Sequence, residues 1–139
     1  MEKALLDTDI LSEVMKARSQ AVLSRAAAYN EQYDRFTVSA VTVMEIIKGL
    51  QRVGRRDALA RFVDRGSALE ILPFDAETAE IAGRIYGDLE RTGQPTGRAD
   101  PMIAATAIQH MLVLVTGNQR HFERIRKLGY EFAVEDWRD

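Results

Sequence analysis

The 139-residue sequence contains no cysteine and only two histidines, His110 and His121. Without cysteine, disulfide frameworks, thiolate metal sites and cysteine nucleophiles are excluded. Two histidines are too few for a zinc site built mainly on imidazole. Aromatic residues make up only 7% and show no spacing of the kind that RNA-stacking sheets use. Hard oxygen ligands are therefore the metal chemistry to expect in this chain.

The chain also has no long apolar run. The longest stretch without Asp, Glu, Lys or Arg is 101–119, and polar residues such as Gln109 and Asn118 interrupt it. This pattern is not that of a membrane span. The amino terminus is acidic and its apolar stretch is too short for a signal peptide. We therefore expect a cytoplasmic protein without a membrane segment.

Neither sign of charge is in excess, because 19 Lys and Arg face 21 Asp and Glu, for a net charge of −2. Proteins that coat nucleic acid usually carry a basic excess, so the total argues against that class. It does not exclude an enzyme whose own acidic site lowers the sum. Two stretches, 48–65 and 120–127, are locally basic, with six cations against two acids and four against one. Each stretch suits a solvated helix face as well as a surface that holds a nucleic-acid backbone.

Short apolar strands alternate with longer amphipathic helices along the chain. The pattern predicts strands at 4–6, 36–38, 69–72 and 112–115 and an edge strand at 132–134. It predicts helices at 10–16, 19–33, 55–65, 75–91, 100–110 and, with Ser39 as the N-cap, 39–51. Length and alternation together indicate a single domain over 1–139 with an α/β fold and a mostly parallel sheet covered on both faces. The loops after such strands meet at one edge of the sheet.

Several acidic residues lie at the ends of predicted elements, and each has a structural explanation. Asp7 directly follows the first strand, where Asp7 or Asp9 can simply cap the next helix. Glu45 shares one polar stripe of its helix with Thr42 and Lys48, and a solvated stripe is the simpler interpretation. A carboxylate aimed into a cleft is the alternative.

Asp100 and Asn118 are ambiguous in the same way. Asp100 before Pro101 is what the physics of a helix start selects, and Asn118 ends an ordinary turn after a strand. Because all four polar side chains can meet at one sheet edge, they also form an oxygen-only ligand set suited to Mg²⁺ or Mn²⁺. The natural chemistry of such a set is phosphate ester cleavage by an activated water.

Five segments occur in order along the chain: LLDTDIL, SAVTVMEIIKGL, ILPFD, GRADPMIAATAI and LVLVTGNQRHF. Together, over essentially the whole chain, they resemble PIN-domain ribonucleases, specifically the toxins of VapBC-type toxin–antitoxin pairs. The resemblance implies a three-layer α/β/α PIN-like fold with a central sheet. It also implies a Mg²⁺-dependent endoribonuclease, with Mn²⁺ as a substitute, that acts as the toxin of a type II toxin–antitoxin system.

The resemblance assigns roles to individual residues. It implies that Asp7, Glu45 and Asp100 are the catalytic, metal-binding acids and that Asn118 occupies the position of a fourth ligand, frequently an Asp in the family. Asp9 is a second departure, because an Asn is common there. Asp9 either restores the missing charge or caps the helix, and we expect the cap. Thr116 resembles the hydroxyl that supports the first acid.

The resemblance also implies partners. Family toxins are homodimers that also assemble with a small antitoxin, which wraps the toxin and can place an Arg in the acidic site. The substrate is RNA. The candidates for holding its backbone are the cations Lys48, Arg52, Arg98 and Arg120.

Two other functions remain open at this point. A haloacid-dehalogenase-like phosphatase is suggested by Asp7-Thr8-Asp9 after an apolar strand, although that mechanism gives no role to Glu45. A catalytically inert PIN-like module that only binds RNA or a partner is kept open by Asn118, which carries no charge.

Overall fold

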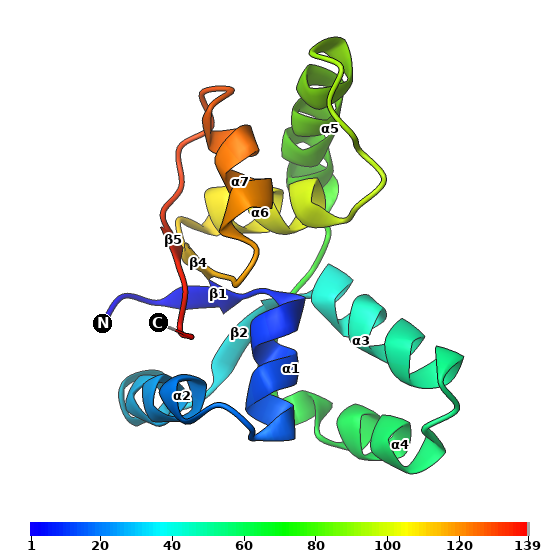
Figure 1. Cartoon of the computed structure of the whole chain (residues 1–139), viewed down its shortest axis with the longest axis vertical. Coiled ribbons are helices and arrows are strands. Elements are labelled where there is room, and N and C mark those ends of the chain that lie inside the picture. Colours follow the sequence, from blue (N-terminus) through cyan, green and yellow to red (C-terminus); the bar gives the residue numbers. More distant parts are fainter. Residues whose placement is uncertain (139) are drawn as a thin grey trace.

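Five parallel strands form one sheet at the centre of the computed structural model, which describes residues 1–138 (Figure 1). The predicted α/β class is confirmed, and every strand pair in the described residues is parallel. The strands are β1 (Ala4–Leu6), β2 (Phe36–Ser39), β3 (Leu69–Leu72), β4 (Val113–Val115) and β5 (Val134–Glu135). The helices are α1 (Thr8–Lys16), α2 (Gln20–Tyr33), α3 (Ala40–Arg52), α4 (Arg56–Asp64), the short 3₁₀ helix η1 (Gly66–Ala68), α5 (Ala76–Arg91), α6 (Asp100–His110) and α7 (Gln119–Arg126).

The central position of β1 decides where a site can form. The sheet order is β3-β2-β1-β4-β5, so the chain builds one side of β1 first and then crosses to the other. Such a reversal leaves a crevice outside the carboxyl ends of two neighbouring strands, here β1 and β4. The N–H of Asp7 donates to the carbonyl of Val115 at 2.8 Å, which keeps the two strands paired up to that crevice.

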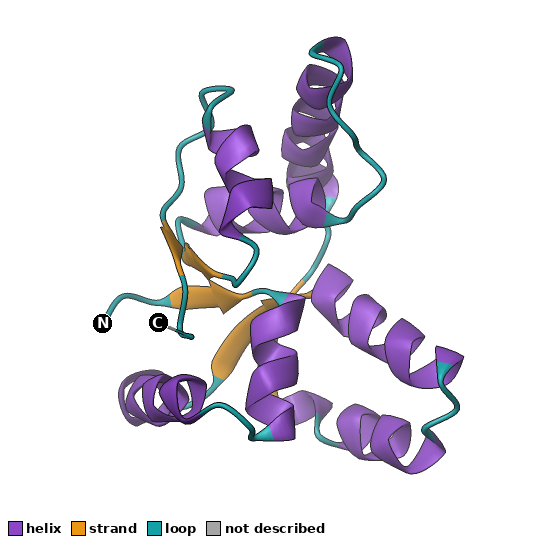
Figure 2. Ribbon diagram, viewed as in Figure 1, coloured by secondary structure: helices purple, strands orange, loops and turns teal. Residues whose placement is uncertain are grey.

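Alternating side chains of the central strands fill two separate cores. Leu6 and Val38 belong to a core with α1, α2 and Trp137. Leu5 and Leu114 belong to the other core, with α5, α6 and α7. Figure 2 shows the resulting arrangement, with helices on both sides of the strands. This is the expected three-layer α/β/α fold.

Two of the predicted helix caps are present. The Ser39 hydroxyl accepts a hydrogen bond from the Val41 N–H at 3.0 Å and begins α3. The Asp75 carboxylate accepts from the Thr78 N–H at 3.0 Å and begins α5. Each satisfies one N–H that the first helical turn would otherwise leave unpaired.

The predicted N-cap role of Asp100 is wrong by one residue. Ala99 is the N-cap of α6, so Asp100 and Pro101 are the first two helical residues. The Asp100 side chain makes no capping hydrogen bond, and its carboxylate is directed to other partners. Pro suits the first turn because the N–H that it lacks has no helical acceptor there.

Other differences concern the carboxyl-terminal third. Helix α7 was not predicted, because it is short and charge-rich and buries only Phe122 and Ile125. The edge strand β5 lies later than predicted, since the carbonyls of Ala133 and Glu135 accept hydrogen bonds from β4 and from Thr116. The uncharged stretch 101–119 divides between α6 and β4. Within residues 1–138, no helix has the length and apolar character required to cross a membrane.

One buried hydroxyl completes the hydrogen bonding of β1. Tyr29 of α2 is fully buried, and its hydroxyl accepts from the Ala4 N–H at 3.1 Å and donates to the Ala4 carbonyl at 3.3 Å. The ring packs near Phe36 and Trp137. Helix α2 is thereby attached to the first residue of the central strand.

Replacing Tyr29 with Phe is expected to lower the free energy of unfolding by about 1–3 kcal/mol, because two buried backbone groups lose their partner. The measurement is urea denaturation followed by circular dichroism. The matched control is Tyr33→Phe, since the Tyr33 hydroxyl donates to the Met1 carbonyl in an exposed position where water can replace it. Equal losses in the two variants would contradict the role given to Tyr29.

Candidate functional site

The carboxylate of Asp7 lies at the crevice between β1 and β4 and is almost fully buried, with 4% of the residue exposed. One oxygen accepts from the N–H of Thr8 at 2.8 Å, so Asp7 is the N-cap of α1. The other oxygen accepts from the hydroxyl of Thr116 at 2.7 Å. The Thr116 hydroxyl in turn accepts from the N–H of Asn118 at 3.0 Å. The N–H of Thr8 and the hydroxyl of Thr116 thus hold the side chain of Asp7 in one orientation, and the N–H of Asn118 holds that hydroxyl.

The surroundings of Asp7 oppose its negative charge. Burial raises the pKa of Asp7 to about 7, and the neighbouring carboxylates of Asp9 and, more weakly, Asp100 act in the same direction. The hydrogen bonds from Thr116 and Thr8 lower the pKa but do not compensate. The fold therefore holds mutually repelling acids in a poorly solvated position.

Asp9 does not cap the helix as expected. It lies in the first turn of α1, and one carboxylate oxygen accepts from the N–H of Gly117 at 2.9 Å and from the side-chain amide of Asn118 at 3.5 Å. The other oxygen is buried and has no hydrogen-bond partner within residues 1–138. Burial raises the pKa of Asp9 as well. Asp9 therefore joins the loop after β4 to the start of α1, and the cap is Asp7.

The carboxyl-terminal segment covers this loop. Arg138 donates from its guanidinium to the carbonyl of Gly117 at 2.7 Å and pairs with Asp136 at 3.1 Å. Its positive charge also lowers the pKa of Asp9. A Cβ atom at Gly117 would meet the guanidinium of Arg138, so a larger residue there would displace the end of this side chain.

Glu45 belongs to the site and not to a solvated stripe. It is partly buried on α3, and its carboxylate accepts from the hydroxyl of Thr8 at 2.6 Å. The same hydroxyl lies 3.1 Å from that of Thr42, which is fully buried. Among the described residues, no ion pair joins Glu45 to Lys48. Thr8 thus links Glu45 to the segment that carries Asp7 and Asp9.

Asp100 is 5% exposed and faces the side chains of Arg98 and His121. One carboxylate oxygen accepts from Arg98 Nε at 3.1 Å and lies 3.3 Å from His121 Nδ1, in ion-pair distance but without hydrogen-bond geometry. The charge of Asp100 also raises the pKa of Asp7. Burial raises the pKa of the Tyr86 hydroxyl most, and the charges of Asp100 and Glu45 raise it further. These mutual effects connect the three predicted acids.

Asn118 lies beside Asp9, after the end of β4. It occupies the N-cap position of α7, and its side chain makes no capping hydrogen bond. Its side-chain amide donates to the carboxylate of Asp9 at 3.5 Å.

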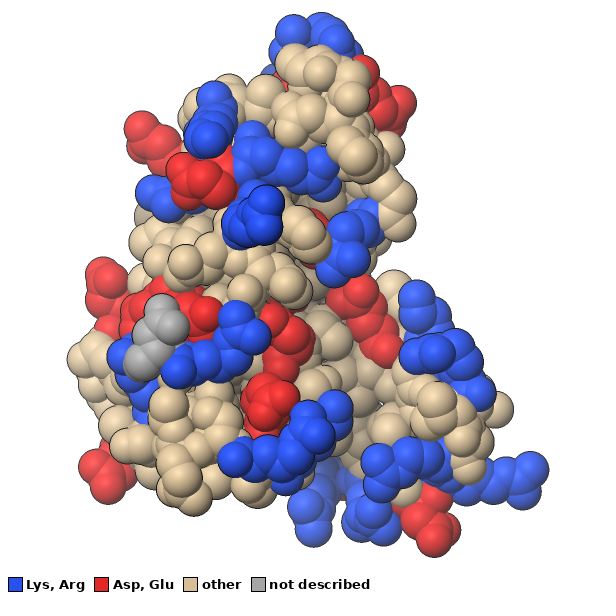
Figure 3. All heavy atoms as spheres, viewed as in Figure 1, with Lys and Arg blue, Asp and Glu red and all other residues tan. Residues whose placement is uncertain are grey.

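The predicted RNA-binding cations are not all equally placed. Lys48 and Arg98 line a small hollow beside Glu45, whereas Arg52 and Arg120 are exposed outside it. Figure 3 shows acidic side chains near the centre of one face, with Lys and Arg side chains over the α3–α4 region on one side and over the α7 region on the other.

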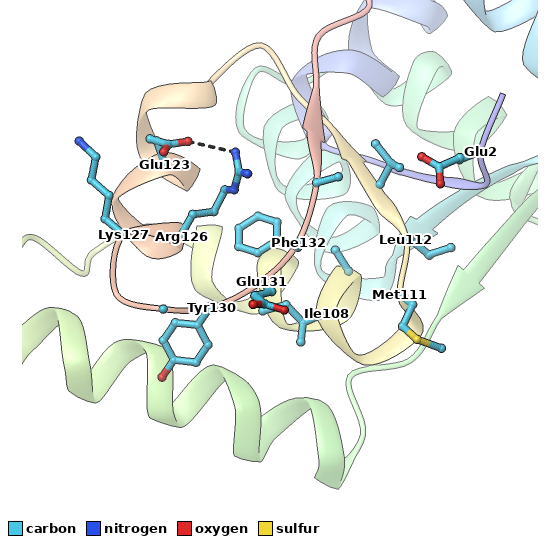
Figure 4. Close-up of a pocket in the computed structure, with 14 residues that line it drawn as sticks. Glu2, Ile108, Met111, Leu112, Glu123, Arg126, Lys127, Tyr130, Glu131 and Phe132 are labelled. Atoms are coloured by element: carbon cyan, nitrogen blue, oxygen red, sulfur yellow. Dashed lines mark hydrogen bonds and ion pairs between the residues drawn. The ribbon is translucent and has the colours of Figure 1, made fainter.

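A larger hollow of about 810 Å³ lies elsewhere (Figure 4). It is formed around the end of α6, the start of β4 and the segment after α7, and residues such as Met111, Tyr130 and Phe132 line it. This hollow lies at the start of β4. The acids Asp7 and Asp9 lie at the opposite end of that strand, beside Thr116 and Gly117. None of the predicted site residues lines it.

The acidic side chains fit a hard divalent cation by their chemistry. Asp7, Asp9 and Asp100 present carboxylate oxygens, the ligands that Mg²⁺ and Mn²⁺ prefer. The unpartnered oxygen of Asp9 is an acceptor that a cation would satisfy. Within residues 1–138, no three His, Asp or Glu side chains already form a closed ligand set. The acids therefore suit the ion by the type of donor atom that they present.

Three residues of the site were not expected from the sequence: Thr8, Tyr86 and His121. Thr8 lies between two acids in Asp-Thr-Asp, a position that points to a shared local network. His121 lies one helical turn after Asn118, a signal that depends on knowing that α7 is a helix. Tyr86 gives no local signal, because its role depends on how α5 packs beside the loop before α6.

Sequence comparison identifies relatives over nearly the whole chain. The family described as PIN domain matches residues 4–128. The tRNA(fMet)-specific endonuclease VapC of Shigella flexneri is 35% identical over 138 residues, covering 99% of each chain. Ribonuclease VapC2 of Haemophilus influenzae is also 35% identical over 138 residues, with the same coverage.

Solved structures show the same likeness. DNA-bound VapBC from Salmonella typhimurium has a chain with a TM-score of 0.80 and 35% identity, covering 99% of both chains. VapBC-1 from nontypeable Haemophilus influenzae has a TM-score of 0.76 and 26% identity, covering 98% of both. The whole arrangement of strands and helices is therefore shared with these proteins.

Replacing Thr116 with Val is expected to weaken Mn²⁺ binding by about 10–100-fold, because the hydroxyl that orients Asp7 is lost while the side-chain volume is kept. Isothermal titration calorimetry of the metal-free protein measures the affinity. Thr106→Val is the matched control, since Thr106 is equally buried but donates to the Met102 carbonyl within α6. An unchanged affinity in Thr116→Val would exclude this orienting role.

Proposed function

The chain belongs to the PIN domain family, and we propose that it is a Mg²⁺-dependent endoribonuclease, formed by a single PIN domain, that acts as the toxin of a VapBC-type toxin–antitoxin pair. Two relatives at 35% identity are named as an endonuclease and a ribonuclease. The observation that carries the proposal is the buried Asp7 carboxylate beside Asp9 and Asp100 at the crevice. A cation relieves the repulsion that such a group creates.

A divalent cation bound to these acids would supply positive charge to a phosphodiester and activate water for its hydrolysis, with Mn²⁺ able to replace Mg²⁺. Asp7, Glu45 and Asp100 are proposed to hold it, with Asn118 as a neutral fourth ligand. Thr116 orients Asp7, and the Thr8 hydroxyl holds Glu45.

Cationic side chains are proposed to hold the RNA backbone. Lys48 and Arg98 are placed beside the acids, and Arg52 and Arg120 lie further along the surface. Arg98 Nε donates to one carboxylate oxygen of Asp100 at 3.1 Å. A phosphate that draws Arg98 away would expose this oxygen for the cation.

The proposed partners follow from the same family. A small antitoxin is expected to cover the acidic site, where an Arg from its chain would pair with Asp7, Glu45 or Asp100 in place of the cation. The relative with a TM-score of 0.80 was solved as DNA-bound VapBC. We propose a cytoplasmic homodimer that also assembles with its antitoxin.

The name of the Shigella relative makes tRNA(fMet) the first substrate to assay. The geometry does not support the phosphatase alternative. That mechanism gives no role to Glu45, whereas here Glu45 accepts a hydrogen bond from Thr8, between Asp7 and Asp9. The inert module remains the outcome to exclude by experiment.

Asp7→Asn, Glu45→Gln and Asp100→Asn are each expected to slow RNA cleavage by about 100-fold or more, as loss of an electrostatic group in a reacting site does. Purified protein without its antitoxin is incubated with tRNA(fMet) and with total RNA, in Mg²⁺, Mn²⁺ or EDTA, and RNA ends are sequenced. EDTA should abolish cleavage by the parent protein.

Asp57→Asn is the control, because Asp57 is an exposed carboxylate on α4 outside the acidic group. It should cut RNA at the parent rate. If the parent protein cuts none of the RNAs in either metal, the inert-module function replaces the nuclease.

Asn118→Asp is expected to tighten Mn²⁺ binding about tenfold, because ligand charge raises affinity for a hard cation. Without metal the same variant should be less stable than the parent, since the new carboxylate lies beside Asp9. Calorimetry and thermal unfolding in EDTA measure the two effects, and Asn30→Asp on the exposed face of α2 is the control. Unchanged or weaker Mn²⁺ affinity would show that position 118 is not a ligand.

A further inference from the structure

The small hollow beside Glu45 has a composition that the metal site does not explain. Its volume is about 370 Å³, within the usual range for small-molecule sites. It lies between α3, α5, the start of α6 and the loop 92–99, which runs back along α5 to α6 (Figure 1). The hollow therefore opens directly beside one of the proposed metal-binding acids.

The lining divides into an apolar part and a cationic part. The apolar part consists of Met44, Tyr86 and Met102. Met44 is a large apolar side chain that is nevertheless 48% exposed. Among the lining residues, Lys48 and Arg98 supply two positive charges against the carboxylate of Glu45, which already accepts from Thr8. Arg98 also pairs with Asp100 at 3.1 Å, so Lys48 is the cation of the lining without an ion pair in the described residues. The combination suits a ligand with a flat apolar part and a negative charge.

Tyr86 gives this hollow a defined wall. Its hydroxyl donates to the carbonyl of Arg98 at 2.8 Å, which ties α5 to the loop that precedes Asp100. The carboxylates of Asp100 and Glu45 both raise the pKa of Tyr86, so its ring lies within electrostatic reach of the acids. The ring is therefore oriented before any ligand arrives.

We infer that this hollow binds one nucleotide of the RNA substrate, with the base against Tyr86 and the methionines and a phosphate at Lys48 and Arg98. The inference rests on the proposed function and adds where an RNA base is recognised. Aromatic and thioether side chains accept the face of any base, and charged side chains hold the phosphate. The nucleotide in the hollow would lie next to the phosphodiester at the acids.

The larger hollow in Figure 4 does not fit the same ligand. Three carboxylates, from Glu2, Glu123 and Glu131, line it against two cations, and one of these, Arg126, pairs with Glu123 at 3.2 Å. A phosphate would meet net negative charge there. The smaller hollow is the one with the opposite balance.

The test is a titration of the antitoxin-free protein, with labelled methionine methyl groups, by each of the four ribonucleoside 5′-monophosphates in EDTA. Saturable NMR shifts are expected at Met44 and Met102 and not at Met111 in the larger hollow. Tyr86→Leu should lower the affinity about fivefold or more, and Tyr86→Phe, which keeps the ring, should restore most of it.

Tyr130→Leu is the matched control, because Tyr130 lines the larger hollow and its hydroxyl also donates to one acceptor, Asp88. It should bind the nucleotides like the parent. Equal affinities of the parent and Tyr86→Leu for the nucleotides would overturn the inference. Binding of N-acetyl-arginine amide but of no nucleotide would also overturn it and would assign the hollow to a protein partner. If the protein binds nucleotides in this hollow but cuts no RNA, the proposed nuclease function is wrong and the nucleotide site stands.

Discussion

Repulsion between carboxylates held out of water is the constraint on which the rest of the site depends. Asp7, Asp9 and Asp100 come from two distant parts of the chain, and burial raises the pKa values of the first two. The fold offsets this cost with polar contacts to each acid: the hydroxyl of Thr116, the N–H of Gly117 and the guanidinium of Arg98. These contacts orient the acids, and Arg98 also brings a positive charge to Asp100.

The same constraint explains the charge of the whole molecule. A net charge of −2 would suggest indifference to nucleic acid, but it averages an acidic centre with basic stretches on α3, α4 and α7. Beside the centre, Lys48 and Arg98 outnumber the one acid of their hollow. The distribution of charge, and not its sum, carries the functional information.

Most of the fold could be predicted from the sequence, because apolar runs and helix caps are local signals. Ser39 and Asp75 cap the helices that their positions indicate. The acids were also nameable, since strand ends in a parallel sheet meet at one edge. The contact of Glu45 with Thr8 was not predictable, because the polar stripe that carries Glu45 looks solvated until Thr8 is placed beside it. Asp9 was misassigned for the same reason: its partner Gly117 lies across the sheet and far along the chain.

The pairing of β1 with β4 also sets an order in time. Asp7 and Thr116 are separated by 109 positions, and β1 can acquire its β4 neighbour only after the chain has been made through residue 115. At the usual pace of translation this interval is roughly 5–20 s. A nascent chain that still lacks β4 has its first acid but neither the hydroxyl nor the loop that holds it.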